Sequence, residues 1–157
     1  MSLGSESHLS DETQNRHEKS KSSSWISWNS GVNLANNSGT NDFLRFGSMI
    51  SSTTSENSTK TVITKSGILS NLTVQLVTST GNGDASPGEG KSRTFTVRKN
   101  GVNTSLLVTI ADSATNGSND DPNNAVSVEK YDLISLVHNV TNGPTNSALG
   151  IASVQIL

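Results

Sequence analysis

The 157-residue chain carries a formal net charge of −2, contains no cysteine, and is only 31% hydrophobic and 15% charged. This composition excludes disulfide bonds and thiolate metal sites. The sequence also lacks the stripe of lysine and arginine residues that nonspecific nucleic-acid binding requires. Serine, threonine and asparagine, at 28, 17 and 18 residues, replace the missing apolar and charged residues. Such a composition favours half-buried β-strands with threonine outward and aliphatic residues inward.

Residues 1–24 are polar and charged without an apolar period. We expect them to form an extended arm, because they cannot bury enough surface to offset the entropy cost of ordering. They contain no apolar run of secretory-signal length, and no stretch of the chain approaches the 18 apolar residues of a membrane span. Synthesis in the cytoplasm is therefore expected, with a final location at the surface of a virion or another extracellular particle.

Residues 25–42 contain both tryptophans in a setting rich in Asn, Gly and Ser. The pattern predicts an irregular anchoring segment. Trp25 and Trp28 have two interpretations: packing into the core, which is favoured, or a stacking platform for a sugar. We therefore place a boundary between a polar arm with its anchoring segment (1–42) and a β-sandwich domain (43–157).

Strands and turns alternate from residue 43 onward. An apolar first strand is predicted at 43–50, and a later strand alternates with a period of two. The inward residues of this later strand are predicted to be Ile68, Leu72, Val74 and Leu76. Gly, Pro, Asn and Asp residues mark 81–91 and 112–124 as loops.

A β-hairpin is predicted at 94–110 around the dipeptide Asn100-Gly101. This dipeptide supplies the positive φ angles of a type I′ turn, which fixes the pairing register locally. The inward residues of the hairpin are predicted to be Phe95, Val97, Leu106, Val108 and Ile110. The cations around its first strand are interpreted as a solvated face: Lys91, Arg93, Arg98 and Lys99.

The last part of the chain contains further strands. A short strand, a turn at Glu129–Asp132 and a longer strand are predicted within 125–140. A final strand at 148–157 has apolar residues on both faces, which suits a central or interface position. No helical period of useful length is present. The sequence therefore predicts an all-β sandwich of about eight antiparallel strands.

No catalytic, cofactor-binding or metal-binding residue is predicted, because no known catalytic or cofactor motif is present. His138 has the inward parity of its strand and is expected to be structural. A loop with Asp112, Asp120 and Asp121 offers oxygen ligands that Ca²⁺ prefers. Its spacing matches no EF-hand loop, however, and Asn- and Asp-rich turns also arise for backbone reasons.

Three motifs resemble a jelly-roll domain found in exosporium collagen-like glycoprotein heads, tumour-necrosis-factor-like trimers, and structural proteins of phages and large DNA viruses. The motifs are G-x-L-x-N-L at 67–72, T-F-T-V-R-x-N-G-V at 94–102 and V-x-V-x-x-x-D-x-I-S-L at 126–136. Related sequences usually have Gly-Asp where this chain has Tyr131-Asp132, and the collagen-like stalk of the spore-surface proteins is absent. The resemblance implies a single jelly roll without catalytic residues, because these domains serve assembly and display.

The leading hypothesis is a non-enzymatic structural protein of a virion-like particle: a capsid, vertex or fibre-head subunit. It would associate as a ring or trimer, and with other particle proteins, through its N-terminal arm and sandwich edges. No cofactor and no specific nucleic acid are expected. The alternatives are a carbohydrate- or receptor-binding head and a trimeric spore-surface protein. Residues expected at oligomer contacts are Trp25, Trp28, Ile151, Val154 and Ile156.

Overall fold

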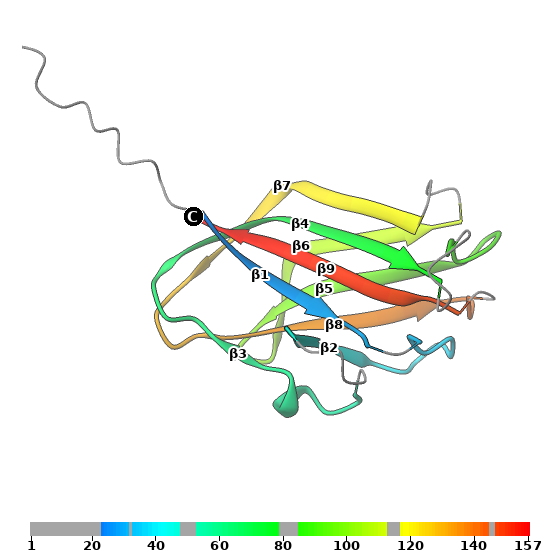
Figure 1. Cartoon of the computed structure of the whole chain (residues 1–157), viewed down its shortest axis with the longest axis horizontal. Coiled ribbons are helices and arrows are strands. Elements are labelled where there is room, and N and C mark those ends of the chain that lie inside the picture. The colour runs from blue at the N-terminus through cyan, green and yellow to red at the C-terminus, as the bar shows by residue number, and fades with distance from the viewer. Residues whose placement is uncertain (1–22, 32, 48–52, 79–84, 113–116, 145–146) are drawn as a thin grey trace, which may run out of the picture.

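Figure 1 shows the computed structural model, which describes residues 23–31, 33–47, 53–78, 85–112, 117–144 and 147–157. The described part of the chain contains nine strands and one short 3-10 helix, η1 (Glu56–Ser58). The strands are β1 Ser24–Asn29, β2 Asp42–Phe46, β3 Thr61–Val62, β4 Gly67–Val77, β5 Ser92–Lys99, β6 Val102–Ala111, β7 Ser118–Val128, β8 Leu133–Thr141 and β9 Leu149–Ile156.

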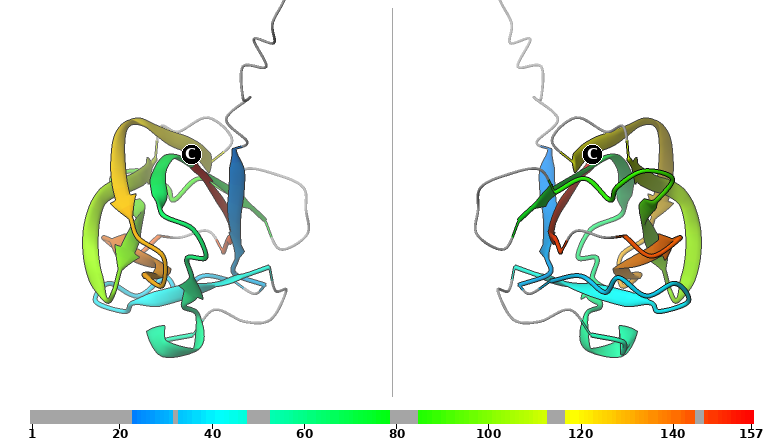
Figure 2. Two further views of the ribbon diagram at one scale, coloured as in Figure 1. Left: turned by 90° about the vertical axis from the view of Figure 1, so that its left-hand side faces the viewer. Right: turned by 90° about the vertical axis from the view of Figure 1, so that its right-hand side faces the viewer.

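The strands form two layers, ordered β1-β9-β4-β7 and β2-β8-β5-β6, with every pairing antiparallel. A short pairing of β1 with β2 joins the layers, and β3 adds to β8. The end views of Figure 2 show the strands surrounding a central core. Because the chain crosses repeatedly between two four-stranded layers, the architecture is a jelly roll. The predicted fold class is therefore confirmed.

The core lies between the two layers and is built from alternate residues of the paired strands. Its largest buried members are Trp28, Phe95, Leu44, Leu69, Leu72, Leu76, Leu106, Ile110, Ile134 and Leu136. Alternation with period two places one face of each strand against this cluster and leaves the other face outward. The fold therefore has two outer faces, one on each layer. The faces differ in whether other segments of the chain cover them, and the candidate sites follow from this difference.

The prediction of an irregular segment at 25–42 is wrong for its first part. β1 pairs with β9 over six residues, with Ile26 and Trp28 inward and Trp25 outward. The two tryptophans stand three residues apart, so they lie on opposite faces of a strand and conceal its period of two. β1, which precedes residue 43, is thus part of the sandwich. Most of the predicted arm, residues 1–22, lies outside the described residues.

The inward parity predicted for β4 is wrong at its start. Ile68 is 48% exposed, whereas Leu69 and Leu72 are both buried. The reason is a β-bulge: the pairing of β4 shifts register next to Asn71, whose φ is 54°. A bulge inserts one extra residue, so the face that points inward changes parity across it.

The prediction of a loop over 112–124 is wrong from Ser118 onward, where β7 begins. β7 is an edge strand that pairs only with β4 along the sheet order, and it contains Pro122. Edge strands tolerate proline because one side of their backbone needs no partner. The Asn and Asp residues at 119–124, on which the loop prediction rested, instead lie in this edge strand.

The remaining predictions for the strands agree with the structure. Asn100 and Gly101 have φ values of 52° and 84°, as a type I′ turn requires. The five inward residues predicted for the hairpin are all buried. The turn at Glu129–Asp132 lies between β7 and β8, and β9 lies centrally between β1 and β4. The predicted first strand ends at Phe46, and residues 48–50 of that prediction lie outside the described residues.

Candidate functional site

The five residues predicted at oligomer contacts occupy three different environments. Trp25 is 56% exposed, and Ile151 is also exposed. Trp28 and Val154 are 1% and 0% exposed in the core, so the prediction that they contact another subunit is wrong. Both occupy inward positions of their strands, where they pack between the layers. Ile156 is partly buried and packs against the core.

One end of the sandwich gathers exposed apolar side chains, which we call the turn-end surface. It consists of Val62, Val102, Tyr131 and Leu133. Val62 pairs with Leu133 across β3 and β8, and the backbone N–H of Tyr131 donates to Ile63, next to Val62. Val102 opens β6 directly after the hairpin turn, whose Asn100 N–H donates to the Leu133 carbonyl. These contacts bring the three segments together at one end of the sandwich.

Tyr131 is the most exposed member of the turn-end surface, at 70%. It adopts a φ of 78°, and the N–H of Asp132 donates to the carbonyl of Glu129 across the turn. A positive φ at this position of a β-turn is the place for glycine, and it strains a residue that carries a Cβ. The turn holds the aromatic ring outward at a cost in backbone strain.

Hydrogen bonds formed by the side chains of Asn100 and Asp132 hold the turns at this end of the sandwich together, and we call this pair the clasp. The Asn100 side chain accepts from the N–H of Leu133 (2.8 Å) and donates to Oδ1 of Asp132 (2.7 Å). Asp132 also accepts from the N–H of Glu129 (2.8 Å), and Lys99 Nζ lies 3.7 Å away. The hydrogen bond from Glu129, followed by that from Asn100, holds the pKa of Asp132 below its usual value. Asn100 therefore joins the hairpin turn to the β7–β8 turn, a role beyond its predicted turn geometry.

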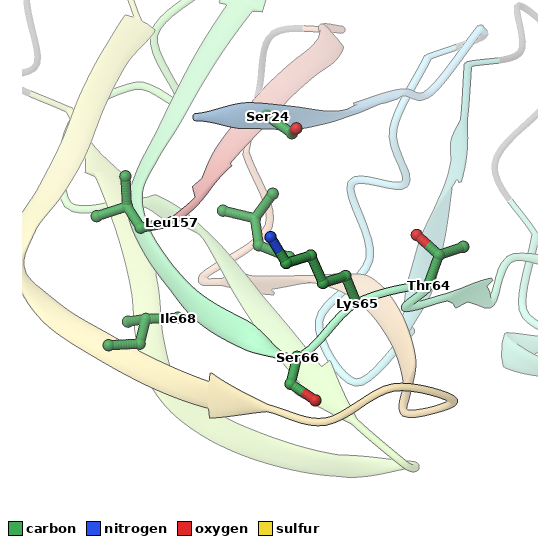
Figure 3. A pocket seen from close by; sticks show the side chains of 7 residues that line it. Ser24, Thr64, Lys65, Ser66, Ile68 and Leu157 are labelled. Carbon is green, nitrogen blue, oxygen red and sulfur yellow. The ribbon is translucent and has the colours of Figure 1, made fainter. Parts of the chain in front are cut away.

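A groove of about 580 Å³ opens at the same end, between the segment before β4 and the ends of β1 and β9 (Figure 3). It is lined by Ser24, Thr64, Lys65, Ser66, Ile68, Ile156 and Leu157. Figure 3 labels Lys65 and the hydroxyl-bearing residues Ser24 and Thr64 among its lining side chains. Ile156, predicted at an oligomer contact, is thus a wall of this groove.

The outer face of β1, β9 and β4 is an exposed surface without a charged side chain. We call it the uncharged face. The strand register, together with the contact of Asn71 with Gln155, arranges nine of its outward residues in three rows: Trp25, Gln155 and Asn71; Ser27, Ser153 and Thr73; Asn29, Ile151 and Gln75. Asn71 is the bulge residue, and its amide nitrogen donates to Gln155 Oε1 at 2.8 Å. Sequence reasoning missed Asn71 and Gln155, because only the register brings them beside Trp25.

The outer face of the other layer is covered by the chain itself. The segment that follows β2 bridges back to it, where the N–H of Phe43 donates to the Thr53 carbonyl at 2.8 Å. Glu56 in η1 then accepts from Arg98 Nε (3.0 Å) and Ser135 Oγ (2.7 Å). Burial acts to raise the pKa of Glu56, but these hydrogen bonds hold it below its usual value. The segment that contains Thr53 and Glu56 therefore covers part of this outer face.

The interpretation of the cations around β5 as a solvated face is wrong for Arg93, which is fully buried. Its Nη1 donates to the carbonyl of Ala35 (2.9 Å) and lies 3.2 Å from Nε2 of His138. Arg93 can only donate, so Nε2 accepts and the imidazole is neutral. Asp42 Oδ2 lies 3.7 Å from Nδ1 of His138 and accepts from the N–H of Ala35. Arg93 has the same strand parity as the inward residues Phe95 and Val97, so parity predicts its burial. Its charge led to the wrong interpretation as an exposed residue.

Burial governs the protonation of this cluster. It lowers the pKa of Arg93 to about 10, which still leaves the guanidinium charged at neutral pH. It also lowers the pKa of His138, an effect that Asp42 partly opposes. The facing imidazole, together with the N–H of Ala35, holds the pKa of Asp42 below its usual value. His138 is thus a structural residue, as the sequence predicts.

The acidic residues of the predicted loop 112–124 have separate partners: Asp112 accepts from the N–H of Gly90, whereas Asp120 and Asp121 lie in β7. Asp121 accepts from the N–H groups of Leu107 (3.1 Å) and Asn124 (3.1 Å), which joins β6 to β7. Burial acts to raise the pKa of Asp121, but these hydrogen bonds hold it below its usual value. Among the described residues, no group of three or more His, Cys, Asp or Glu side chains is placed to hold a metal ion. No helix in the described part of the chain has the length and apolar character of a membrane span.

Comparisons with known proteins add no argument to the fold described above. A scan against protein-family models found no match, and a search of curated proteins found none. Among solved structures, the crystal structure of murine APRIL at pH 8.0 is similar, with a TM-score of 0.35 and 10% sequence identity. The similarity covers 83% of this chain and 98% of that one. The jelly roll itself rests on the strand order, and this similarity carries no argument about function.

Proposed function

We propose that the protein is a non-enzymatic structural subunit of a virion-like particle, which associates with further copies of itself through the turn-end surface. One observation carries the proposal: Val62, Val102, Tyr131 and Leu133 are all exposed at one end of the sandwich. Grouped apolar side chains favour a contact with another protein. The sequence resemblance to structural proteins of phages and large DNA viruses supports the particle as its setting.

Tyr131 suits the centre of such a contact. Tyrosine combines a large apolar ring with a hydroxyl that can be paired at the rim, and it is enriched among the residues that dominate binding energy. The clasp formed by Asn100 and Asp132 holds the turn beneath it. A surface that is already ordered loses less entropy when it binds, so a small apolar patch can suffice.

The test is the native mass of the chain in solution, measured by light scattering after size exclusion at micromolar concentration. We expect a multiple of the 16.5 kDa chain mass. The paired variant Val62→Thr with Leu133→Thr should weaken association about tenfold or more, because it removes apolar contact area while threonine, a β-branched residue, still suits a strand.

Leu107→Thr is the matched control, because Leu107 is an exposed leucine on β6 outside the turn-end surface. Its mass should equal that of the wild type. A wild-type chain that stays monomeric would contradict the proposal, and so would a paired variant that associates as well as the control.

A further inference from the structure

We propose that the uncharged face binds a neutral oligosaccharide, with Trp25 as the stacking platform. This inference goes beyond the proposed function, because the uncharged face and the turn-end surface consist of different residues. The argument rests on Trp25, on the adjacent amide pair, and on the charge of the surrounding surface.

Trp25 presents an aromatic ring on a fixed strand. It is 56% exposed, and its backbone pairs with Gln155 near the start of the β1–β9 ladder. An indole ring offers a broad apolar surface at a low entropy cost, because few of its bonds rotate. The apolar face of a sugar ring, where C–H bonds point outward, is a flat partner for such a surface.

The amide pair beside Trp25 has a defined orientation. Asn71 Nδ2 donates to Gln155 Oε1, so the Gln155 amide nitrogen and the Asn71 amide oxygen remain for other partners. One of these groups donates and the other accepts. A pair of neighbouring sugar hydroxyls can accept from the first and donate to the second. The row from Trp25 to Asn71 crosses three strands, a span of roughly 10 Å at the usual strand spacing.

Charge selects a neutral sugar over an acidic one. β1, β9 and β4 carry no charged residue, although the chain has 24 Lys, Arg, Asp and Glu residues. The charged side chains that the register places beside this face have opposite signs: Asp120 of β7 pairs with Thr73, and Arg45 of β2 pairs with Asn29. Because the face itself carries no cation, an anionic sugar gains no charged partner there, whereas a neutral one needs none.

A second copy of the chain fits this face less well. The second row of the face consists of Ser27, Ser153 and Thr73, and serine is depleted at protein interfaces. Burying hydroxyls and amides against another protein costs free energy unless each finds a partner. A sugar meets this need because every hydroxyl both donates and accepts.

The two tryptophans make a direct test feasible. Trp25 is 56% exposed and Trp28 is 1% exposed, so an aqueous quencher such as acrylamide reports on Trp25. The full chain is titrated with neutral hexasaccharides of glucose, mannose, galactose and N-acetylglucosamine, and with oligogalacturonate as the acidic probe. We expect at least one neutral series to protect Trp25 from quenching and to give a binding isotherm by calorimetry, while oligogalacturonate gives neither.

Variants separate this site from the turn-end surface. Trp25→Ala should weaken sugar binding about tenfold or more, and Trp25→Phe should retain part of it, because phenylalanine keeps an aromatic face. Val62→Thr with Leu133→Thr should leave sugar binding unchanged, whereas Trp25→Ala should leave the native mass unchanged. The two proposals can therefore fail independently.

Two outcomes would overturn the inference. In the first, no neutral series changes quenching or heat. In the second, Trp25 becomes protected without sugar as protein concentration rises, and Trp25→Ala lowers the native mass. The second outcome would assign the uncharged face to contacts between copies of the chain.

Discussion

Single residues with positive φ decide where this chain turns or bulges. Among the described residues other than glycine, four have a positive φ: Asn71, Asn100, Tyr131 and Asn142. Asparagine tolerates this conformation because its short side chain can bond locally, but a bulky aromatic residue does not. Among these four residues, Tyr131 is therefore the one whose side chain is least compatible with its backbone conformation.

Replacing Tyr131 with glycine should raise the free energy of unfolding by about 1 kcal/mol. Relief of the strain at a φ of 78° outweighs the greater freedom of glycine in the unfolded chain. Chemical denaturation measures the change, and the variant is best made together with Val62→Thr and Leu133→Thr, so that altered association does not contribute.

Tyr131→Ala is the matched control for this prediction. It removes the ring and its contact with Lys130, whose Nζ lies 4.8 Å from the ring centroid, but it keeps the Cβ that causes the strain. Alanine should therefore give no gain in stability. If the glycine and alanine variants were equally stable, the turn would not be strained by the side chain.

Whole elements could be predicted where local chemistry dictates them. The β5–β6 hairpin follows from Asn100-Gly101 and alternating residues, because a type I′ turn sets the register before any distant contact forms. β1 and β7 could not be predicted in this way. β1 becomes a strand through its ladder with β9, and β7 through Asp121 and its place at the sheet edge. Both depend on partners far away in the sequence.

The segment around η1 behaves as a cover for one layer, and Glu56 holds it in place. Glu56→Ala should destabilise the protein by about 1 kcal/mol, because Arg98 and Ser135 lose a charged hydrogen-bond partner that is largely but not fully shielded from water. The amides of Phe43 and Thr53, which bond to each other's carbonyls, should exchange faster with deuterium.

Asn57→Ala tests whether this effect is specific to the carboxylate. Asn57 lies in the same turn, where its side chain accepts from Lys60 Nζ on the exposed side. Its replacement should leave the exchange of Phe43 and Thr53 unchanged. Equal exchange in Glu56→Ala and wild type would mean that backbone pairing alone holds the cover.

For the whole molecule, the buried cluster of Arg93, His138 and Asp42 sets the response to acid. Burial lowers the pKa of His138 below its usual value of 6.5, so the unfolded chain binds a proton at a higher pH than the folded chain does. The free energy of unfolding should therefore fall as the pH drops below about 6.5, by at most about 1.4 kcal/mol per pH unit for this one proton. Asp42, whose pKa is also lowered, adds a further loss below its usual value of 3.8.

His138→Gln should flatten the pH dependence between pH 7 and 5, because glutamine does not titrate and still offers an oxygen to Arg93. Urea denaturation at several pH values measures the slope. The other two histidines, at positions 8 and 17, are present in both proteins and cancel in the comparison. An unchanged slope in the variant would show that acid sensitivity arises elsewhere.

The candidate sites were the least predictable part of the molecule. Trp25, Trp28, Ile151 and Val154 were all expected at oligomer contacts, yet only Trp25 and Ile151 are exposed, whereas Trp28 and Val154 lie in the core. Packing into the core, the favoured interpretation of both tryptophans, holds for Trp28 and is wrong for Trp25. Composition cannot distinguish the two sides of a strand that is apolar on both. Only the register of β1 with β9 and β4 assigns each side chain to a face and brings Asn71 beside Gln155.

The separation between the turn-end surface and the uncharged face has a consequence for avidity. Copies joined through their turn ends would each keep an uncharged face open, because the faces share no residue with the contact. A single shallow site with one aromatic ring binds weakly, but several such sites on one rigid body engage a repeated glycan at a high effective concentration. Apparent affinity for a glycan-coated surface would then rise steeply with the number of subunits, although no individual site had changed.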